Sequence, residues 1–389
     1  MALLDLALAR RAGGTAWVPD AAMGHLAPTR QWAAVVHGRA FLQYAATAGT
    51  RTAQQFGSVN WIEGMVTGPA PRGRLAMGMM LSAEPWTLPA PGAPELLQVA
   101  VPYQGLLVAD RQPPHLALMD LSMAYLASLG RDLTAGIYLA AVGDPALGPP
   151  VYLHRPAATA DPTLPLGHHA QDATHSSAGV VTVDLATHDV HLEGSWFNGA
   201  HSIPGDVLPD YNGASLDSWG LRLTVNPGAR SSVAGWYGFV AGGKGLHVHD
   251  AQHRVGASWL YTEPMEGSHQ WSASLIASAN IPTATGRLLP SALVESSWTF
   301  RAATTLFARV EYVRRTAAEL ALTGSVPAEL DVGAASLGAT RRVWVHAPWA
   351  AWLGGRGVVN LVPASLEPFY GSRSPLGLVA SIEIRVGDH

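Results

Sequence analysis

The chain has 389 residues, of which 48% are hydrophobic and only 13% are charged, and its net charge is −4; an average soluble domain is roughly 25% charged. No run of 18 apolar residues exists, which excludes a helical membrane protein, and the lack of a Lys/Arg tract excludes electrostatic binding of nucleic acid. The absence of cysteine excludes disulfides, zinc–thiolate sites, Fe–S clusters and cysteine nucleophiles. With 41 glycines, 28 prolines and 13 tryptophans, the composition is typical of a closed β-barrel in an outer membrane, whose strands alternate apolar-out and polar-in.

Residues 1–31 precede the first strand pattern and are predicted to form an N-terminal periplasmic segment, followed by a single barrel domain over 32–389. The start of the chain does not resemble a secretory signal peptide, because Asp5 interrupts its short apolar stretch and Arg10 and Arg11 follow that stretch. Export to an outer membrane requires such a signal. We therefore expect the chain to begin at the mature protein or to carry a misassigned gene start.

From residue 32 onward the chain contains strand-length runs in which apolar and polar residues alternate. Leu221 and Leu223, for example, alternate with Arg222 and Thr224. Sixteen such runs predict a transmembrane antiparallel barrel of about 16 strands, with 14 or 18 as the alternatives. They lie at 32–48, 54–68, 73–87, 116–129, 133–143, 179–187, 189–199, 217–227, 231–241, 253–263, 269–280, 291–302, 304–316, 332–344, 350–362 and 376–386.

The predicted connections alternate in length, being short after even-numbered strands and mostly long after odd-numbered strands from the third onward. The two longest are 88–115 and 143–178. Outer-membrane barrels have short periplasmic turns and long extracellular loops, so this alternation favours a barrel over a β-sandwich with Greek-key crossovers. An even strand count also places both chain ends on the periplasmic side.

Tryptophans occur near many predicted strand ends, where an amphipathic ring suits the membrane–water interface. They are predicted to form interfacial girdles, the alternative being that tryptophan simply packs well in strands and cores. The residues concerned are Trp32, Trp61, Trp86, Trp219, Trp236, Trp271, Trp344, Trp349 and Trp352.

Charged and histidine side chains on the polar faces of the strands are predicted to point into the lumen, where they can pair across strands. Both signs occur in near balance, which indicates a wetted, partly obstructed channel without strong ion selectivity. The residues are His37, Arg39, Glu84, Asp120, His191, Glu193, Arg222, Glu295, Arg301, Arg309, Glu311, Glu383 and Arg385.

The proline-rich loop 143–178 is long enough to carry a function and is predicted to fold into the barrel and narrow it. It contains His154, His168, His169, Asp172 and His175, which are candidate ligands for a copper-type metal ion. The alternative is that these side chains hydrogen-bond to the loop backbone and fix the loop to the wall. Further histidines are predicted in other loops, namely His115, His201, His247 and His249.

Several segments resemble a family of uncharacterised bacterial outer-membrane β-barrel proteins, often encoded beside copper and other heavy-metal resistance genes. The segments are LSAEPWTL, VADRQPPH, YLAAVGDPALGPPVYLHRPAA, PLGHHAQDATHSSAGVVT, LEGSWFNG and LDSWGLRLTVNP. The resemblance implies a barrel fold and outer-membrane placement, and no established activity. The chain departs from the family pattern at Asp110–Leu116, where relatives tend to have DRQHPHD, and at Phe197–Ser202, where they tend to have FNGREPDE. Any metal or charge network through these loops is therefore altered here.

The predicted function is an outer-membrane, porin-like barrel that lets small solutes or ions pass, with the 143–178 loop as its constriction. One alternative is a metal-binding protein of a metal-resistance system. The other is a structural or enzymatic barrel without transport. No GxSxG nucleophile elbow is present, so we expect no enzyme and no certain cofactor. The expected partners are the lipid bilayer and small solutes, and the sequence names no oligomeric state.

Overall fold

The computed structural model describes residues 3–23, 31–199, 204–209, 215–242, 251–264 and 269–387. His201, His247 and His249 lie outside these described residues. The smaller elements are the helices α1 (Leu3–Ala9), η1 (Asp20–Ala22), α2 (Glu84–Thr87), α3 (His168–Gln171), η2 (Ala364–Leu366) and α4 (Glu367–Tyr370), and the short strands β4 (Ala93–Pro94), β5 (Val101–Tyr103), β6 (Leu106–Val108) and β7 (Arg111–Gln112). Among the described residues, no helix has the length and apolar character needed to cross a membrane.

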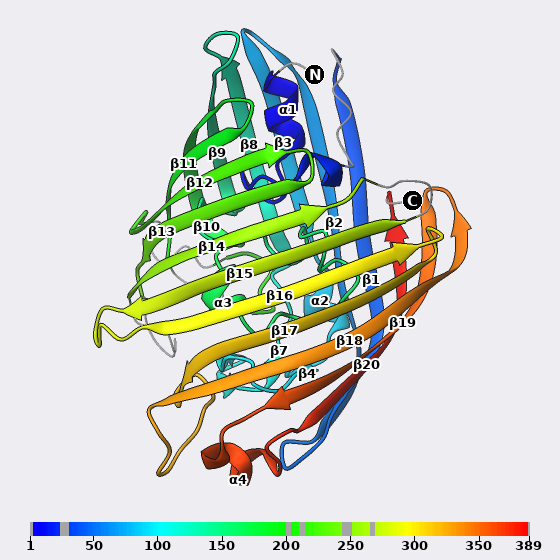
Figure 1. Ribbon diagram of the computed structural model, residues 1–389, viewed down its shortest axis with the longest axis vertical. Coiled ribbons are helices and arrows are strands. Elements are labelled where there is room, and N and C mark those ends of the chain that lie inside the picture. The colour runs from blue at the N-terminus through cyan, green and yellow to red at the C-terminus, as the bar shows by residue number, and fades with distance from the viewer. Residues whose placement is uncertain are drawn as a thin grey trace.

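Sixteen antiparallel strands pair in chain order and close into one barrel (Figure 1). Closure is made by β1 and β20, whose register runs from Gly38 opposite Val386 to Thr47 opposite Gly377. The all-β fold and the strand count predicted from the sequence are therefore confirmed. The barrel strands are β1 (Ala33–Thr47), β2 (Ala53–Ala70), β3 (Gly73–Leu81), β8 (Leu118–Ser128), β9 (Thr134–Gly143), β10 (Ser177–Ala186), β11 (Val190–Phe197), β12 (Ser218–Gly228), β13 (Ser231–Val240), β14 (Gln252–Thr262), β15 (Gln270–Pro282), β16 (Leu289–Phe300), β17 (Thr304–Thr316), β18 (Glu329–His346), β19 (Trp349–Leu361) and β20 (Leu376–Val386).

The connections between strands differ between the two ends of the barrel. At the end where the chain enters β1 and leaves β20, neighbouring strands are joined by short turns such as 71–72, 187–189, 229–230 and 347–348. At the opposite end, 82–117 joins β3 to β8 and 144–176 joins β9 to β10. We call these the short-turn end and the long-loop end; α4 marks the latter at the bottom of Figure 1.

The two faces of the wall have opposite character, because successive side chains of a strand point to opposite sides of the sheet. In β12, Leu221 and Leu223 point outward and are 51% and 47% exposed, whereas Arg222 and Thr224 point inward and are each 1% exposed. The same apolar outward face recurs around the wall, in residues that include Val36, Met79, Leu121, Leu192, Leu275, Val310, Leu353 and Ile382. A barrel with this arrangement presents an apolar surface to its surroundings and keeps its polar groups inside.

The tryptophans divide between the two faces, which corrects part of the girdle prediction. Trp271, Trp344 and Trp349 are 40–51% exposed on the outside, as expected for interfacial rings. Trp61, Trp236 and Trp352, in contrast, are only 5–6% exposed and share the inward face of their strands with polar side chains. The period-2 parity of each strand, and not closeness to a strand end, decides where its tryptophan points.

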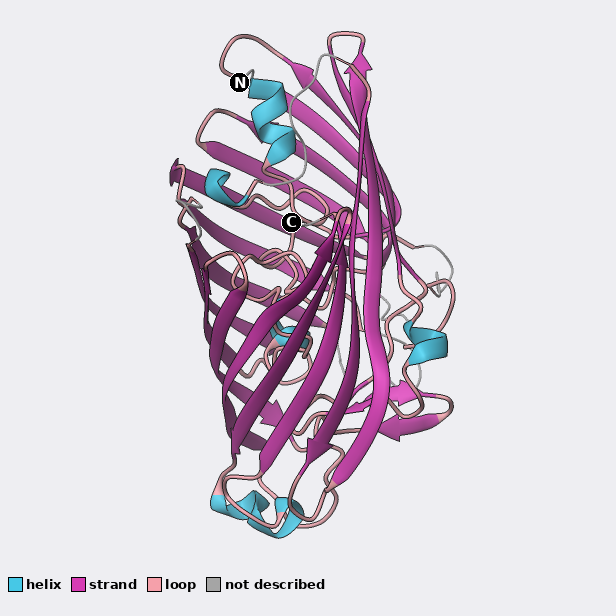
Figure 2. Ribbon diagram, turned by 90° about the vertical axis from the view of Figure 1, so that its right-hand side faces the viewer, coloured by secondary structure: helices cyan, strands magenta, loops and turns pink. Residues whose placement is uncertain are grey.

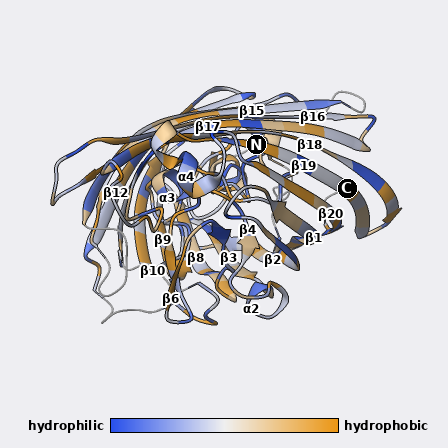
Figure 3. Ribbon diagram, turned by 90° about the horizontal axis from the view of Figure 1, so that it is seen from below, coloured by the Kyte–Doolittle hydropathy of each residue, from blue (hydrophilic) through white to orange (hydrophobic). Residues whose placement is uncertain are grey.

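Segments of the polypeptide backbone, and not only side chains of the wall, fill the interior of the barrel. Figure 2 shows α1 inside the upper mouth, and Figure 3 shows connecting segments lying within the ring of strands. At the long-loop end, Leu97 and Leu166 pack into one buried cluster with Leu320, Leu366 and Tyr370 from other connections. This cluster packs the connections against the wall at the long-loop mouth with apolar side chains.

Candidate functional site

Eleven of the thirteen predicted lumen residues do lie on strands with their side chains on the inward face. They are His37, Arg39, Asp120, His191, Glu193, Arg222, Glu295, Arg309, Glu311, Glu383 and Arg385. Most pair with one another across neighbouring strands. Glu383 of β20, for example, binds Arg39 of the neighbouring β1 at 3.1 Å, and also Arg385 of its own strand at 2.6 Å.

Arg301 is a correction, because it does not point into the lumen. The strand predicted to run to 302 ends at Phe300. Arg301 then adopts a positive φ of 54° in the turn to β17 and is exposed at the short-turn end. Alternation of side chains predicts the facing of a residue only while the strand continues, and a tight turn ends it.

Glu84 is a second correction, because it lies in α2 and not on β3. β3 ends at Leu81, and Pro85, which lacks a backbone N–H, cannot continue a paired strand. The Glu84 carboxylate is nevertheless buried, at 1% exposure. It accepts hydrogen bonds from the backbone N–H groups of Asn60 (3.1 Å) and His115 (2.9 Å). Asn60 lies on β2 beyond the last residue that pairs with β3. Glu84 therefore caps an open edge of the wall.

The connection 144–176, which we call the internal loop, folds back into the barrel and binds its wall on more than one side. On β11 and β12, Arg222 makes a two-pronged ion pair with Glu193, both contacts at 2.8 Å, and donates to the Gly148 carbonyl at 3.0 Å. The Ala146 N–H donates to the Ser195 hydroxyl at 2.7 Å. The predicted loop 143–178 therefore does enter the lumen.

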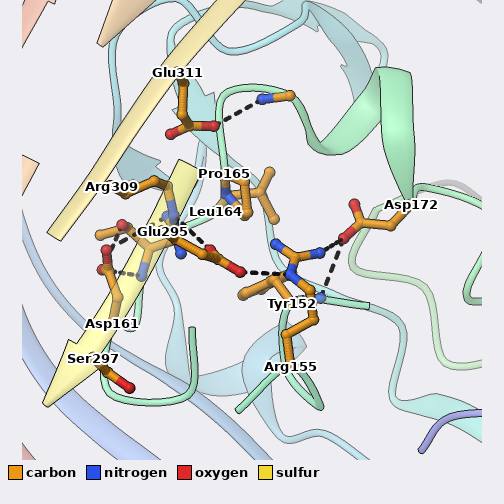
Figure 4. A network of polar contacts seen from close by, with 12 residues as sticks. Tyr152, Arg155, Asp161, Leu164, Pro165, Asp172, Glu295, Ser297, Arg309 and Glu311 are labelled. Carbon is orange, nitrogen blue, oxygen red and sulfur yellow. Dashed lines mark hydrogen bonds and ion pairs between the residues drawn. The ribbon is translucent and has the colours of Figure 1, made fainter. Parts of the chain in front are cut away.

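Arg155 joins the internal loop to a second part of the wall, at β16, four strands from β12 (Figure 4). Its guanidinium is fully buried and binds Glu295 of β16 at 2.7 Å and Asp172, within the loop itself, at 2.6 Å. Asp172 also accepts from the Tyr152 N–H at 3.2 Å. A buried guanidinium with two carboxylates fixes geometry strongly, because removing any one member leaves an uncompensated charge.

A second set of ion pairs lies beside Glu295. Arg309 bridges Glu295 (3.1 Å) and Asp161 of the loop (3.4 Å), and Asp161 also binds Arg356 of β19 at 3.2 Å. Glu311 accepts a hydrogen bond from the Gly167 N–H at 3.1 Å. The loop is thus held by charged side chains of β12, β16, β17 and β19. Figure 4 shows those of β16 and β17, namely Glu295, Arg309 and Glu311, facing the loop.

Two carboxylates of the loops respond differently to this environment. Burial opposes ionisation of Asp172, but His168 and Arg155 outweigh it and hold the pKa of Asp172 well below its usual range. Burial raises the pKa of Glu95 to about 8, although Arg356, 3.9 Å away, opposes that rise. At neutral pH Asp172 is therefore a charged anchor, whereas Glu95 is largely protonated.

The structure brings only some of the candidate metal ligands together. The His168 Nδ1 lies 2.6 Å from Asp172, and the His168 ring lies 5.3 Å from that of His169 and 5.2 Å from that of His175. His154 lies elsewhere, with its Nε2 3.8 Å from Glu63. Within the described part of the chain, no three His, Cys, Asp or Glu side chains are grouped so that they could hold a metal ion. The metal site stays a prediction.

Residues 3–23, part of the predicted periplasmic segment 1–31, lie inside the short-turn mouth. Trp17 stacks on His191 with ring centroids 4.5 Å apart, and Arg11 binds Asp184 of β10 at 2.9 Å. The Ser232 hydroxyl donates to the Trp17 carbonyl oxygen at 3.3 Å. This N-terminal segment therefore packs inside the barrel and does not form a separate domain.

A cavity of about 480 Å³ lies between the N-terminal segment, the internal loop and the wall. We call it the mouth cavity. Its lining includes Arg11, Met23, Arg39, Trp61, Glu63, Leu153, His154, Arg342, Trp352 and Arg385. A smaller cavity of about 90 Å³ lies deeper, lined by residues that include Met80, Met119, Asp120 and His175. The lumen thus has its larger space at the short-turn end, and the long-loop end is narrowed by the buried apolar cluster.

Sequence reasoning missed the residues that anchor the contents: Arg155, Asp161, Arg356 and Trp17. One signal was present, since Arg155 is the single Lys or Arg between 144 and 176. An isolated cation in a long apolar loop indicates a buried partner elsewhere, because an unpaired buried charge is costly. Nothing in the sequence identifies that partner as Glu295.

No protein-family model and no curated protein matches this chain. Among solved structures, OmpF of Salmonella typhi, solved in complex with daunomycin, is similar over 90% of this chain and 97% of its own, with a TM-score of 0.54 and 10% identity. OprB of Pseudomonas putida is similar over 92% and 94%, with a TM-score of 0.53 and 9% identity. The anion-selective porin from Comamonas acidovorans is similar over 91% and 100%, with a TM-score of 0.50 and 11% identity. These likenesses concern the fold.

Proposed function

We propose that this protein is an outer-membrane, porin-like barrel that passes small solutes or ions, with the internal loop as its constriction. The short-turn end then faces the periplasm and the long-loop end the exterior. The apolar outward face and the alternation of short turns and long loops support the membrane placement. One of the barrels of similar fold is named as an anion-selective porin, which supports the transport class.

The observation that carries the proposal is the internal loop crossing a polar lumen from wall to wall. Arg222 of β12 donates to the Gly148 carbonyl, and Arg39 of β1, seven strands away around the closed barrel, donates to the Thr159 carbonyl at 2.7 Å. A barrel needed only as a structural element has no use for a wall lined with paired charges, which are costly to bury. A solute path, by contrast, needs a polar surface together with something that restricts it.

The direct test is single-channel recording of the refolded chain in planar bilayers. The proposal predicts discrete, small conductance steps, because the internal loop and the N-terminal segment leave little free cross-section. Insertion of the folded barrel is verified by protease protection in vesicles. If the inserted barrel then gives no conductance steps, solute passage is contradicted and the filled structural barrel is favoured.

The same recording separates the metal-handling alternative from simple passage. Added Cu²⁺ or Zn²⁺ should block the channel if the loop histidines bind the ion. In that case the block should disappear in a variant carrying both His168→Ala and His169→Ala. Equal conductance with and without metal would contradict the metal-handling alternative and leave the porin-like function.

A further inference from the structure

We propose that the mouth cavity is a binding site for small organic anions, such as carboxylates with a compact apolar body. Its volume of about 480 Å³ lies in the range of pockets that take small organic molecules, roughly 300–1,000 Å³. The inference deepens the proposed function by naming its solute class. Binding itself does not require a conducting pore, so the two can fail independently.

The charge of the lining favours an anion. Four arginines line the cavity, Arg11, Arg39, Arg342 and Arg385, and Glu63 is the acidic residue among its described lining residues. Glu63 is itself bound to His37 at 2.9 Å. A cavity whose charged lining is mainly guanidinium, within low-dielectric walls, attracts negative charge.

Arg342 is the guanidinium best placed to bind such a ligand. It lies on the inward face of β18 and is partly buried, with its guanidinium carbon 5.9 Å from the centre of the Trp352 ring. No carboxylate among the described residues forms an ion pair with it. The other three differ: Arg11 binds Asp184, and Arg39 and Arg385 both bind Glu383.

Two buried indole groups add neutral donors to the same cavity. Trp61 and Trp352 are each 6% exposed, both line the cavity, and the Nε1–H of each lacks a hydrogen-bond partner among the described residues. A buried donor without a partner is costly, so such groups call for an acceptor. An anion bound at Arg342 supplies that acceptor to Trp352, which pairs with Arg342 across β18 and β19. Trp61 offers its donor to the cavity from β2.

The remaining lining explains why the ligand is organic and not an inorganic ion. Met65, Leu153 and Val18 contribute apolar surface beside the arginines. The apolar part of a carboxylate would cover this surface, and the carboxylate would face the donors. The geometry therefore points to a ligand with one charged end and one apolar end.

The test is isothermal titration of the full, folded chain in a neutral detergent, with benzoate as the anionic probe and benzyl alcohol as its neutral counterpart. We expect benzoate to bind at least about tenfold more tightly than benzyl alcohol, the ratio for loss of one charge-assisted hydrogen bond. Equal affinity, or no binding of benzoate to folded wild-type protein, would overturn the proposal.

The matched variants are Arg342→Gln and Arg341→Gln, which remove neighbouring charges on opposite faces of β18. Arg342→Gln should weaken benzoate binding about tenfold and leave benzyl alcohol unchanged, whereas Arg341→Gln should change neither. Equal weakening by both would show that diffuse charge, and not the cavity, attracts the anion. Arg342→Lys retains the charge and should keep most of the affinity, which guards against a folding defect in Arg342→Gln.

If benzoate binds as expected and the bilayer recordings stay silent, the anion site stands and solute passage fails. If channels open but benzoate does not bind, solute passage stands and the anion site fails. The two outcomes therefore separate the binding site from the proposed transport.

Discussion

The barrel wall and the internal loop are built by different rules, although they are packed against each other. In the wall, β16 and β17 pair residue by residue along their length, as with Val294 opposite Val310. The internal loop is more deeply buried than the wall, but its regular structure is one short helix, α3. It is held by contacts such as that of Arg155 with Glu295, 140 residues away in sequence. The wall is stabilised by regular backbone pairing, whereas the loop is stabilised by a few charged side chains.

This difference makes the loop the part that single substitutions can release. Each wall strand is held by backbone hydrogen bonds along its length, so the loss of one side chain leaves the strand paired. The loop depends on a small number of buried ion pairs, and breaking one of them costs far more than breaking an exposed pair.

The largest effect is expected from Arg155→Met, which leaves Glu295 and Asp172 buried with one partner fewer. We expect a loss of about 3 kcal/mol in the stability of the loop–wall association. In the assay, the internal loop should become sensitive to proteinase K while the barrel fragments stay resistant. If the loop stays as protected as in the wild type, the ion pair with Glu295 does not hold it.

A rescue variant sharpens that result. Replacing Arg155 by Met, Glu295 by Leu and Asp172 by Asn together removes the stranded charges as well as the arginine. Protection should recover in part, because an apolar replacement of a buried charge cluster is often neutral. An equal loss of protection in both variants would show that Arg155 acts through shape and not through charge.

The next effect concerns an edge of the wall that a loop residue completes. Glu84→Ala leaves the Asn60 and His115 backbone N–H groups without their acceptor, and we expect a loss of about 2 kcal/mol. Heat-induced unfolding in detergent, followed by circular dichroism, measures this. Glu84→Gln keeps one acceptor oxygen and should lose about half as much; a midpoint unchanged in both would contradict the capping role.

A gradual effect, spread over several pH units, is expected through Glu95. Its pKa in the folded protein is raised to about 8, so the folded state holds the proton more tightly than the unfolded chain. Stability should therefore fall as pH rises from about 5 to 8, by at most about 1.4 kcal/mol per pH unit. Glu95→Gln should flatten this dependence in thermal unfolding, and an identical slope in the variant would exclude Glu95 as its cause.

The smallest effect is expected at an exposed ion pair on the wall. Arg314 binds Asp331 at 2.8 Å, with side chains 34% and 53% exposed. Arg314→Met should leave the thermal unfolding midpoint in detergent unchanged within error, because an exposed ion pair contributes little to stability. It is therefore the matched control for Arg155→Met. A comparable loss of stability in both variants would show that buried ion pairs of the lumen contribute no more than exposed ones on the wall.

The same distinction explains how much could be predicted from the sequence. The wall follows from period-2 alternation and turn residues, which are local, and Leu221, Arg222 and Leu223 have the facing that their parity predicts. Alternation failed where a strand stopped, at Glu84 and Arg301. The partners of the internal loop depend on which strands lie opposite after closure, so the contact of Arg155 with Glu295 has no local signature. His154, similarly, is in the predicted loop but lies beside Glu63 of β2 and apart from His168.

The most direct test of the internal loop as constriction is the conductance of a deletion of residues 150–170. The deletion can be rejoined across a short distance, since a Cβ added to Gly148 would lie 2.4 Å from the Gln171 carbonyl oxygen. We predict larger single-channel conductance than in the wild type, with the wall intact by circular dichroism. Unchanged conductance in a folded, inserted barrel would contradict the assignment of the internal loop as the element that restricts passage.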